Sequence, residues 1–381
     1  MSEPARLAAY YFAFFAHAGA FVSYFALYLA DLGLRAGEIA FAVAMPQIAR
    51  IVAPALWGWL ADAWGARYGG ARRAIVVFSS FAFLAGFLAL AFQERAAAIA
   101  LTLLLMSLLS AGASPLIEAI TLSTLEGRPG LYGPIRLWGS IGFIIAVLGA
   151  GAWLDLAGVS ALAGLLIGLS IVVCGAALVL PAGAAPRIVS GGERLAAVLR
   201  RPAVLAFFGA CFCMAAAHGT LHVFYSLYLE EAGYSKTLTG LLFTVGVLAE
   251  IVLFLRLPQL MRRFSLRALL LASFACAVLR FPAIGWGVSS LALLAAAQLL
   301  HAATFGAFHA GCVAAMHRLF PGALAARGQA LYSGIGYGLG GATGSLVAGW
   351  SWTALGPQAS FALSALFAVA GAGLVAWKFR V

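Results

Sequence analysis

Twelve apolar stretches of about 20 residues or more follow one another along the chain, and short loops separate them. A helix of about 20 apolar residues is long enough to cross the hydrocarbon core of a bilayer. The alternation typical of transmembrane barrel strands is absent from them. The stretches therefore predict an all-α membrane protein with twelve transmembrane helices. These spans lie at residues 7–30, 38–61, 74–92, 96–124, 134–154, 160–181, 203–229, 237–258, 268–286, 289–316, 328–350 and 358–377.

Composition excludes the main soluble classes. Hydrophobic residues make up 64% of the chain and charged residues only 9%, whereas a soluble domain carries about 25% charged residues. A water-soluble enzyme, a disordered chain and a disulfide-stapled secreted module are therefore ruled out. The five cysteines all lie inside apolar stretches, which predicts small buried side chains rather than disulfides or a metal site.

Basic residues sort strongly by side of the membrane. The chain has 23 Lys and Arg against 12 Asp and Glu, a net charge of +11. Sixteen basic residues fall on the side that holds both termini and only three, Arg35, Arg95 and Lys236, on the other. By the positive-inside rule both termini are expected in the cytoplasm, as in a multi-pass protein of a bacterial-type cytoplasmic (inner) membrane. Because orientation explains most of the basic excess, no nucleic-acid partner is predicted.

An internal repeat divides the chain in two. At a shift of 200 residues, the LYL of residues 27–29 meets the LYL of residues 227–229, and at a shift of 191 Arg136 meets Arg327. Several matches recur in the same order, which predicts two pseudo-symmetric six-helix bundles. We place them at residues 1–181 and 203–381, joined by a cytoplasmic linker at residues 182–202. In transporters built from parallel repeats, the binding site lies at mid-membrane between the halves.

Charges deep inside a span cost several kcal/mol, so each requires a reason. Glu118 and Arg136 lie nine residues on either side of Gly127, the centre of the turn between spans four and five. Two antiparallel helices leaving one turn place both at about 13 Å depth, at 1.5 Å per residue. When separated, the carboxylate can hold a proton and the guanidinium a substrate anion. The alternative is a permanent ion pair that fixes the hairpin.

The second half carries its own candidates. His301 and His309 are eight residues apart, so both can lie on one face of span ten and relay a proton, although either can be a packing histidine. Arg50 and Glu250 occupy repeat-equivalent positions with opposite charge, as expected of a gate or of charge partners. Arg280 lies near the outer end of span nine, where it either contacts substrate or snorkels to the interface.

A short motif follows span two. The run GWLADAWGAR, residues 58–67, contains Gly58, Asp62, Gly65 and Arg67. We expect a loop in which Gly65 allows a tight turn, Asp62 caps a neighbouring helix and Arg67 pairs across the cytoplasmic side. Such a latch would favour one conformation by about 1–3 kcal/mol. A merely capped loop with orienting charges is the alternative.

These residues resemble a known group. The run GWLADAWGAR resembles the major facilitator loop signature G-x-L-A-D-x-x-G-R-[KR], with Ala66 in place of the usual Arg. Residues 132–143, YGPIRLWGSIGF, look like the span-five signature of the lactose and phenylpropionate permeases. Residues 216–218, 247–250, 279–280 and 298–309 are similar specifically to the phenylpropionate permease branch, itself related to lactose and nucleoside proton symporters.

The resemblance implies a major facilitator fold and a proton-coupled importer that works by alternating access. It implies that Glu118 and Arg136 belong to the substrate site and that His301 and His309 lie near the proton path. Thr304 stands where the lactose permease has a glutamate after its span-ten histidine. That proton route therefore does not transfer, and Glu250 or Glu118 must carry the proton.

The residues together predict a secondary transporter that takes up a small organic anion, such as a phenylpropionate-like aromatic carboxylate, with a proton. Three deep arginines against two deep glutamates leave a positive charge that a carboxylate can balance. A sugar or nucleoside symporter or a small-molecule efflux carrier is the alternative. Since no Ser/His/Asp set is found, we do not expect an enzyme. We expect a monomer in the bilayer, driven by a proton gradient without a cofactor.

Overall fold

The computed structural model describes residues 1–381 except 66–69, 127, 184–194 and 380–381. Helices dominate the described residues, which contain no strand. Eleven of the helical runs in this part of the chain are long and apolar enough to cross a membrane. The twelfth predicted span, 328–350, lies in a run that is helical from Ala325 to Leu355 but rich in glycine, which makes it less apolar. The expected all-α fold is confirmed.

Contacts divide the chain into two compact units. Unit 1 comprises Met1–Arg35, Ile48–Ile188 and Ser235–Gly240, and unit 2 comprises Ala36–Gln47, Val189–Tyr234 and Leu241–Val381. The helix that begins at Ala36 thus starts in unit 2 and continues in unit 1. The helix that begins at Lys236 starts in unit 1 and continues in unit 2. Of the predicted linker, residues 184–194 lie outside the described part. The following residues form a short helix, α8 (Leu195–Leu199).

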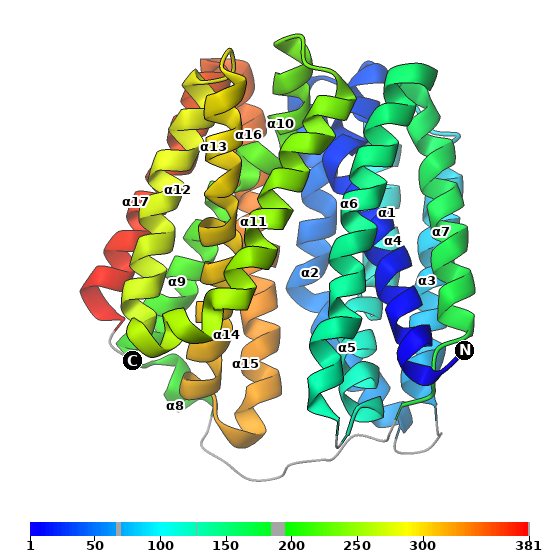
Figure 1. The fold of residues 1–381 in the computed structure, drawn as a ribbon, viewed down its shortest axis with the longest axis vertical. Coiled ribbons are helices and arrows are strands. Elements are labelled where there is room, and N and C mark those ends of the chain that lie inside the picture. The colour runs from blue at the N-terminus through cyan, green and yellow to red at the C-terminus, as the bar shows by residue number, and fades with distance from the viewer. Residues whose placement is uncertain (66–69, 127, 184–194, 380–381) are drawn as a thin grey trace. The chain divides into compact units, whose positions relative to one another are not determined.

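Unit 1 is built on its first helix, which contacts α6 and α7, while α3 packs against α4, α5 and α7 (Figure 1). Leu7, Tyr10 and Tyr11 of α1 are buried in one apolar cluster with Ile117 and Ile120 of α5. The helices of this half are α1 (Glu3–Asp31), α2 (Ala36–Gly65), α3 (Ala71–Leu90), α4 (Ala96–Ser110), α5 (Ala113–Thr124), η1 (Pro129–Leu131), α6 (Tyr132–Ala157), η2 (Val159–Ala161) and α7 (Leu162–Leu178).

Unit 2 has a continuous core in which α12 and α9 both pack against α17. Two of its spans contain π-helical segments, η3 and η5, and such segments occur frequently at functional sites. Its helices are α9 (Pro202–Ala217), α10 (Gly219–Glu231), α11 (Lys236–Arg263), α12 (Leu266–Trp286), α13 (Leu291–Leu299), η3 (Ala302–Ala307), α14 (Phe308–Leu319), η4 (Gly322–Leu324), α15 (Ala325–Leu331), η5 (Tyr332–Gly340), α16 (Gly341–Leu355) and α17 (Pro357–Lys378).

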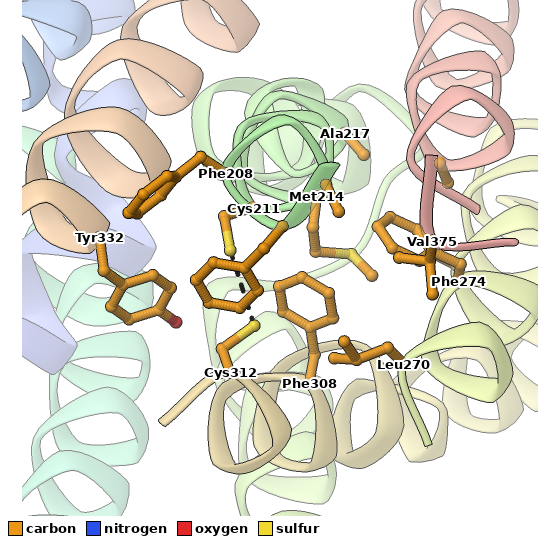
Figure 2. Packing of buried hydrophobic residues seen from close by; sticks show 14 of the residues in the cluster. Phe208, Cys211, Met214, Ala217, Leu270, Phe274, Phe308, Cys312, Tyr332 and Val375 are labelled. Carbon is orange, nitrogen blue, oxygen red and sulfur yellow. Dashed lines mark hydrogen bonds between the residues drawn. The ribbon is translucent and has the colours of Figure 1, made fainter. Parts of the chain in front are cut away.

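Figure 2 shows this core from close by. Side chains of α9, α12 and α14 interdigitate there, with Phe274 and Phe308 in edge-on contact at a centroid distance of 5.3 Å. Cys211 and Cys312 face each other with their sulfur atoms 3.7 Å apart. All five cysteines are unbonded thiols, four of them buried and Cys276 half-buried. The prediction that they act as small apolar side chains is confirmed.

Close helix contact in unit 1 depends on a glycine of α6. A Cβ atom at Gly142 would lie 3.0 Å from the Phe12 Cα atom and closer still to the Phe12 carbonyl oxygen. Both of those atoms belong to the backbone of α1, which cannot move aside as a side chain can. Gly142 therefore sets the separation of α1 and α6, the two helices that carry Tyr11 and Arg136.

Replacing Gly142 with Ala should push these two helices apart and destabilise the protein by about 1–3 kcal/mol, because overpacking forces a backbone shift. Gly149 is a matched control on the same helix, since nothing lies within 4 Å of a Cβ placed there. Thermal denaturation in detergent should show a lower melting temperature for Gly142→Ala and little change for Gly149→Ala. Equal melting temperatures for the two variants would show that the contact between Gly142 and the Phe12 backbone does not restrict the side chain at this position.

Candidate functional site

Glu118 is held by tyrosines in unit 1. The Tyr11 hydroxyl of α1 donates to Glu118 Oε2 at 2.8 Å, and the Tyr132 hydroxyl of α6 donates to Glu118 Oε1. The same Tyr11 hydroxyl is 3.3 Å from Thr121 Oγ1, which lies one turn further along α5. The carboxylate thus has a neutral donor on each oxygen, which stabilises it in an apolar surrounding without a second charge.

Arg136 lies one turn after Tyr132 on α6, and its guanidinium rests on aromatic rings. The Cζ atom is 4.1 Å from the centroid of the Phe15 ring and 5.4 Å from that of Tyr11. These distances are those of cation–π contacts. Within the described part of the chain, no hydrogen bond or ion pair joins this guanidinium to another residue. Its N–H donors remain available while its flat face is already positioned.

Glu118 and Arg136 therefore do not pair directly in this structure. Both residues contact Tyr11, whose ring lies against the guanidinium and whose hydroxyl binds the carboxylate. No ion pair within 4.0 Å joins the two among the described residues. A permanent ion pair fixing the hairpin is thus not observed here, because aromatic side chains satisfy each group separately.

In unit 2, the structure brings His301 and Glu250 together. Nε2 of His301, at the start of η3, is 3.6 Å from Oε2 of Glu250 on α11. The ring of Phe305 stacks on His301 at 5.2 Å and on His309 at 6.4 Å. The two histidines thus lie along one face of span ten, as their spacing predicts, with one phenylalanine between them.

His309 also contacts the other π-helical segment. Its Nδ1 atom is 3.0 Å from the hydroxyl of Tyr332 and 3.0 Å from that of Tyr337, both in η5. The two hydroxyls are themselves 3.4 Å apart. This cluster joins spans ten and eleven through groups that each can donate and accept, which is the requirement for moving a proton along a chain.

Arg280 is fully buried, with 1% of its surface exposed. One of its terminal nitrogens donates to Thr304 Oγ1 at 2.9 Å and the other to Gln298 Oε1 at 3.1 Å. The alternative in which Arg280 snorkels to the interface is wrong, because its side chain is directed into the bundle towards span ten. Repeat-equivalent Arg50 and Glu250 are assigned to unit 1 and unit 2 respectively.

The predicted loop motif is helical in its described part. Helix α2 continues to Gly65, so Gly58, Asp62 and Gly65 occupy its last turns rather than a loop, which corrects the expectation. Asp62 Oδ1 is 4.0 Å from a terminal nitrogen of Arg72 in the first turn of α3. Asp62 is 63% exposed, and such exposed pairs contribute little stability. Arg67 lies outside the described residues.

Sequence reasoning missed the aromatic partners of these charges. Most contacts to Glu118, Arg136 and His309 come from aromatic side chains that the sequence did not identify as partners. These are Tyr11, Phe15, Tyr132 and Tyr332. One signal was available in the sequence, because Tyr132 precedes Arg136 by four residues and so shares its helix face. Tyr11 is 107 residues from Glu118, and no local pattern could have linked them.

Changing Tyr132 to Phe should remove one donor from Glu118 while keeping the ring, and should destabilise the protein by about 1–3 kcal/mol. Tyr28→Phe is the control, because Tyr28 is a buried tyrosine of α1 whose hydroxyl makes no hydrogen bond to a described residue. Melting temperatures in detergent compare the two. If Tyr28→Phe lowers the melting temperature as much as Tyr132→Phe does, the lost contact with Glu118 is not the cause of the destabilisation.

Eleven described helical runs that are long and apolar enough to cross a membrane, with ionisable side chains held inside them, are typical of a multi-pass membrane protein. The chain belongs to the MFS_1 like family, which matches residues 5–363. It is 29% identical over 359 residues to a probable 3-phenylpropionic acid transporter of Escherichia coli strain K12, covering 92% of this chain and 91% of that protein. The identity with the putative nucleoside transporter YegT of the same strain is 28%, over 74% of this chain and 69% of that protein.

Solved structures show the same fold. The crystal structure of the nucleoside transporter NupG superposes with a TM-score of 0.81 at 18% identity, over all of both chains. A bacterial homologue of the human lysosomal transporter Spinster gives a TM-score of 0.70 at 15% identity, over 99% of this chain and 96% of that one. The expected major facilitator fold is confirmed, and the protein is a transporter of this family.

Proposed function

We propose that the protein imports a small organic anion, an aromatic carboxylate of the phenylpropionate type, together with a proton. The observation that carries the proposal is the state of Arg136, which rests on Phe15 and Tyr11 with no carboxylate among the described residues bound to it. A guanidinium binds a carboxylate through two parallel hydrogen bonds. The adjoining rings offer a surface on which an aromatic substrate can stack.

The relatives support this class of substrate. The sequence is 29% identical to a probable 3-phenylpropionic acid transporter over nearly the whole length of that protein. A neutral sugar or nucleoside would not balance the Arg136 charge, so the site favours an anion over the alternatives. The proposed cycle begins with protonation from outside, continues with anion binding at Arg136, and ends when the halves rock and release both inward.

The proton carrier in this proposal is one of the two deep carboxylates. Glu250 lies against His301, and a carboxyl–imidazole pair can exchange a proton without leaving a net buried charge. Glu118 is bound by two hydroxyls, which can pass a proton to it. We further propose a monomer in the bacterial inner membrane, with both termini in the cytoplasm as the loop charges indicate and a proton gradient as the only driving agent.

Replacing Arg136 with Gln should lower uptake of labelled 3-phenylpropionate into proteoliposomes by at least about tenfold, because loss of a paired charge costs more than about 1.4 kcal/mol. Arg128→Gln is the matched control, since Arg128 is exposed on the loop of the same hairpin. Both variants should reconstitute equally. Uptake that is undiminished in Arg136→Gln refutes the anion site, and proton-driven uptake of uridine or maltose instead would favour the alternative substrates.

Replacing Glu250 with Gln should separate transport from its driving force. Glutamine keeps the shape but holds no proton, so the variant should still exchange labelled for unlabelled substrate while losing accumulation under an inward proton gradient. Glu94→Gln, an exposed loop change, should accumulate substrate normally. The same pair of assays on Glu118→Gln shows which carboxylate couples. Gradient-driven accumulation retained in both variants contradicts the proposed coupling.

A further inference from the structure

The surroundings of Arg280 in unit 2 leave its charge without a counter-charge. Both of its hydrogen-bond partners, the Thr304 hydroxyl and the Gln298 carbonyl oxygen, are neutral. Among the described residues no carboxylate oxygen lies within 4.0 Å of this guanidinium. The neighbouring carboxylate of Glu250 instead faces His301. A guanidinium this deeply buried is normally paired with an anion.

The same place contains buried donors with no acceptor. The Arg280 Nε atom and the Gln298 Nε2 atom are both buried and make no hydrogen bond. Because a guanidinium can only donate, Gln298 must turn its oxygen towards Arg280, which leaves its NH₂ group unsatisfied. The orientation of the amide is thus fixed by chemistry. Two adjacent side chains together present free N–H groups in a site closed to solvent.

A third donor comes from α10. The Tyr225 hydroxyl is buried, faces the Gln298 side chain and is close enough to Arg280 to interact with it electrostatically. His218 adds no donor, because its Nδ1–H is directed to the Met214 carbonyl oxygen at 2.8 Å. The group therefore consists of one full positive charge and the buried donors of Arg280, Gln298 and Tyr225, contributed by α12, α13 and α10.

We propose that this group is a binding site for a small monovalent anion, either a halide ion or the carboxylate of an organic acid. A water molecule could take up the hydrogen bonds but would leave the guanidinium charge uncompensated. One negative charge balances that guanidinium, whereas a dianion such as sulfate would leave an excess of opposite sign. The site is distinct from Arg136, lies wholly within unit 2 and does not depend on the proposed transport substrate.

The test measures the melting temperature of the purified full-length protein in detergent at constant ionic strength. Sodium bromide or sodium formate is titrated against sodium sulfate. An anion that binds only the folded protein should raise the melting temperature saturably, by about 3 °C at a hundredfold excess over its Kd. Sulfate should give no saturable rise. Absence of a bromide- or formate-specific rise would overturn the proposal.

Gln298→Glu is the decisive variant, because it places a carboxylate where the amide oxygen now accepts from Arg280. This internal anion should abolish the rise with bromide and formate. Gln358→Glu makes the same chemical change at the start of α17, where the amide contacts the Tyr228 hydroxyl rather than Arg280, and should retain the rise. If Gln298→Glu responds to the anions as the wild type does, the site is refuted.

A second measurement covers the case in which Gln298→Glu does not fold. Wild-type crystals soaked in bromide should show an anomalous peak beside Arg280 if a halide occupies the site. A response to formate and to 3-phenylpropionate but not to bromide identifies the source as an organic carboxylate, and the peak is then sought with bromoacetate. No peak with either compound refutes the proposal. The melting experiments are also run on Arg136→Gln, in which the rise should persist if the anion binds at Arg280, so this test and the Arg136 uptake test can fail separately.

Discussion

The cost of placing a charge in an apolar interior governs the described sites of this protein. Three of the deep charges are each stabilised by a different type of partner: hydroxyls at Glu118, aromatic rings at Arg136 and neutral amide and hydroxyl oxygens at Arg280. Direct pairing of opposite charges would be the simplest solution, but it would also occupy the groups permanently. Neutral partners hold the charged groups in place and leave them able to bind another molecule.

Irregular helices place these groups. Spans ten and eleven each contain a π-helical segment, and His301, His309, Tyr332 and Tyr337 lie in or beside these segments. An extra residue in a helical turn rotates the following side chains relative to those before it. His309 can therefore meet two hydroxyls of a neighbouring helix at once. The glycines of span eleven permit this irregular stretch, because they add no side chains to be accommodated.

The fold was predictable from the sequence and the contacts at the sites were not. Twelve apolar stretches mark twelve helical runs because crossing the membrane requires a long, uniformly apolar segment, and local composition records that requirement. Glu118 and Arg136 stood out because charges are rare in such segments. Their partners did not, since tyrosine and phenylalanine are common there and a contact such as Tyr11 to Glu118 depends on packing between distant spans. The motif predicted a loop because its glycines are typical of turns, whereas helix α2 continues to Gly65.

Thr304 connects the two polar groups of unit 2. Its hydroxyl accepts from Arg280 and lies 3.4 Å from the His301 carbonyl oxygen, so it joins the buried guanidinium to the helix turn that presents His301 to Glu250. A carboxylate at this position would neutralise Arg280 within the chain, whereas threonine only orients it. Arg280 also interacts electrostatically with His301. An anion bound at Arg280 would therefore favour a proton on the neighbouring imidazole, and by reciprocity that proton would favour the anion.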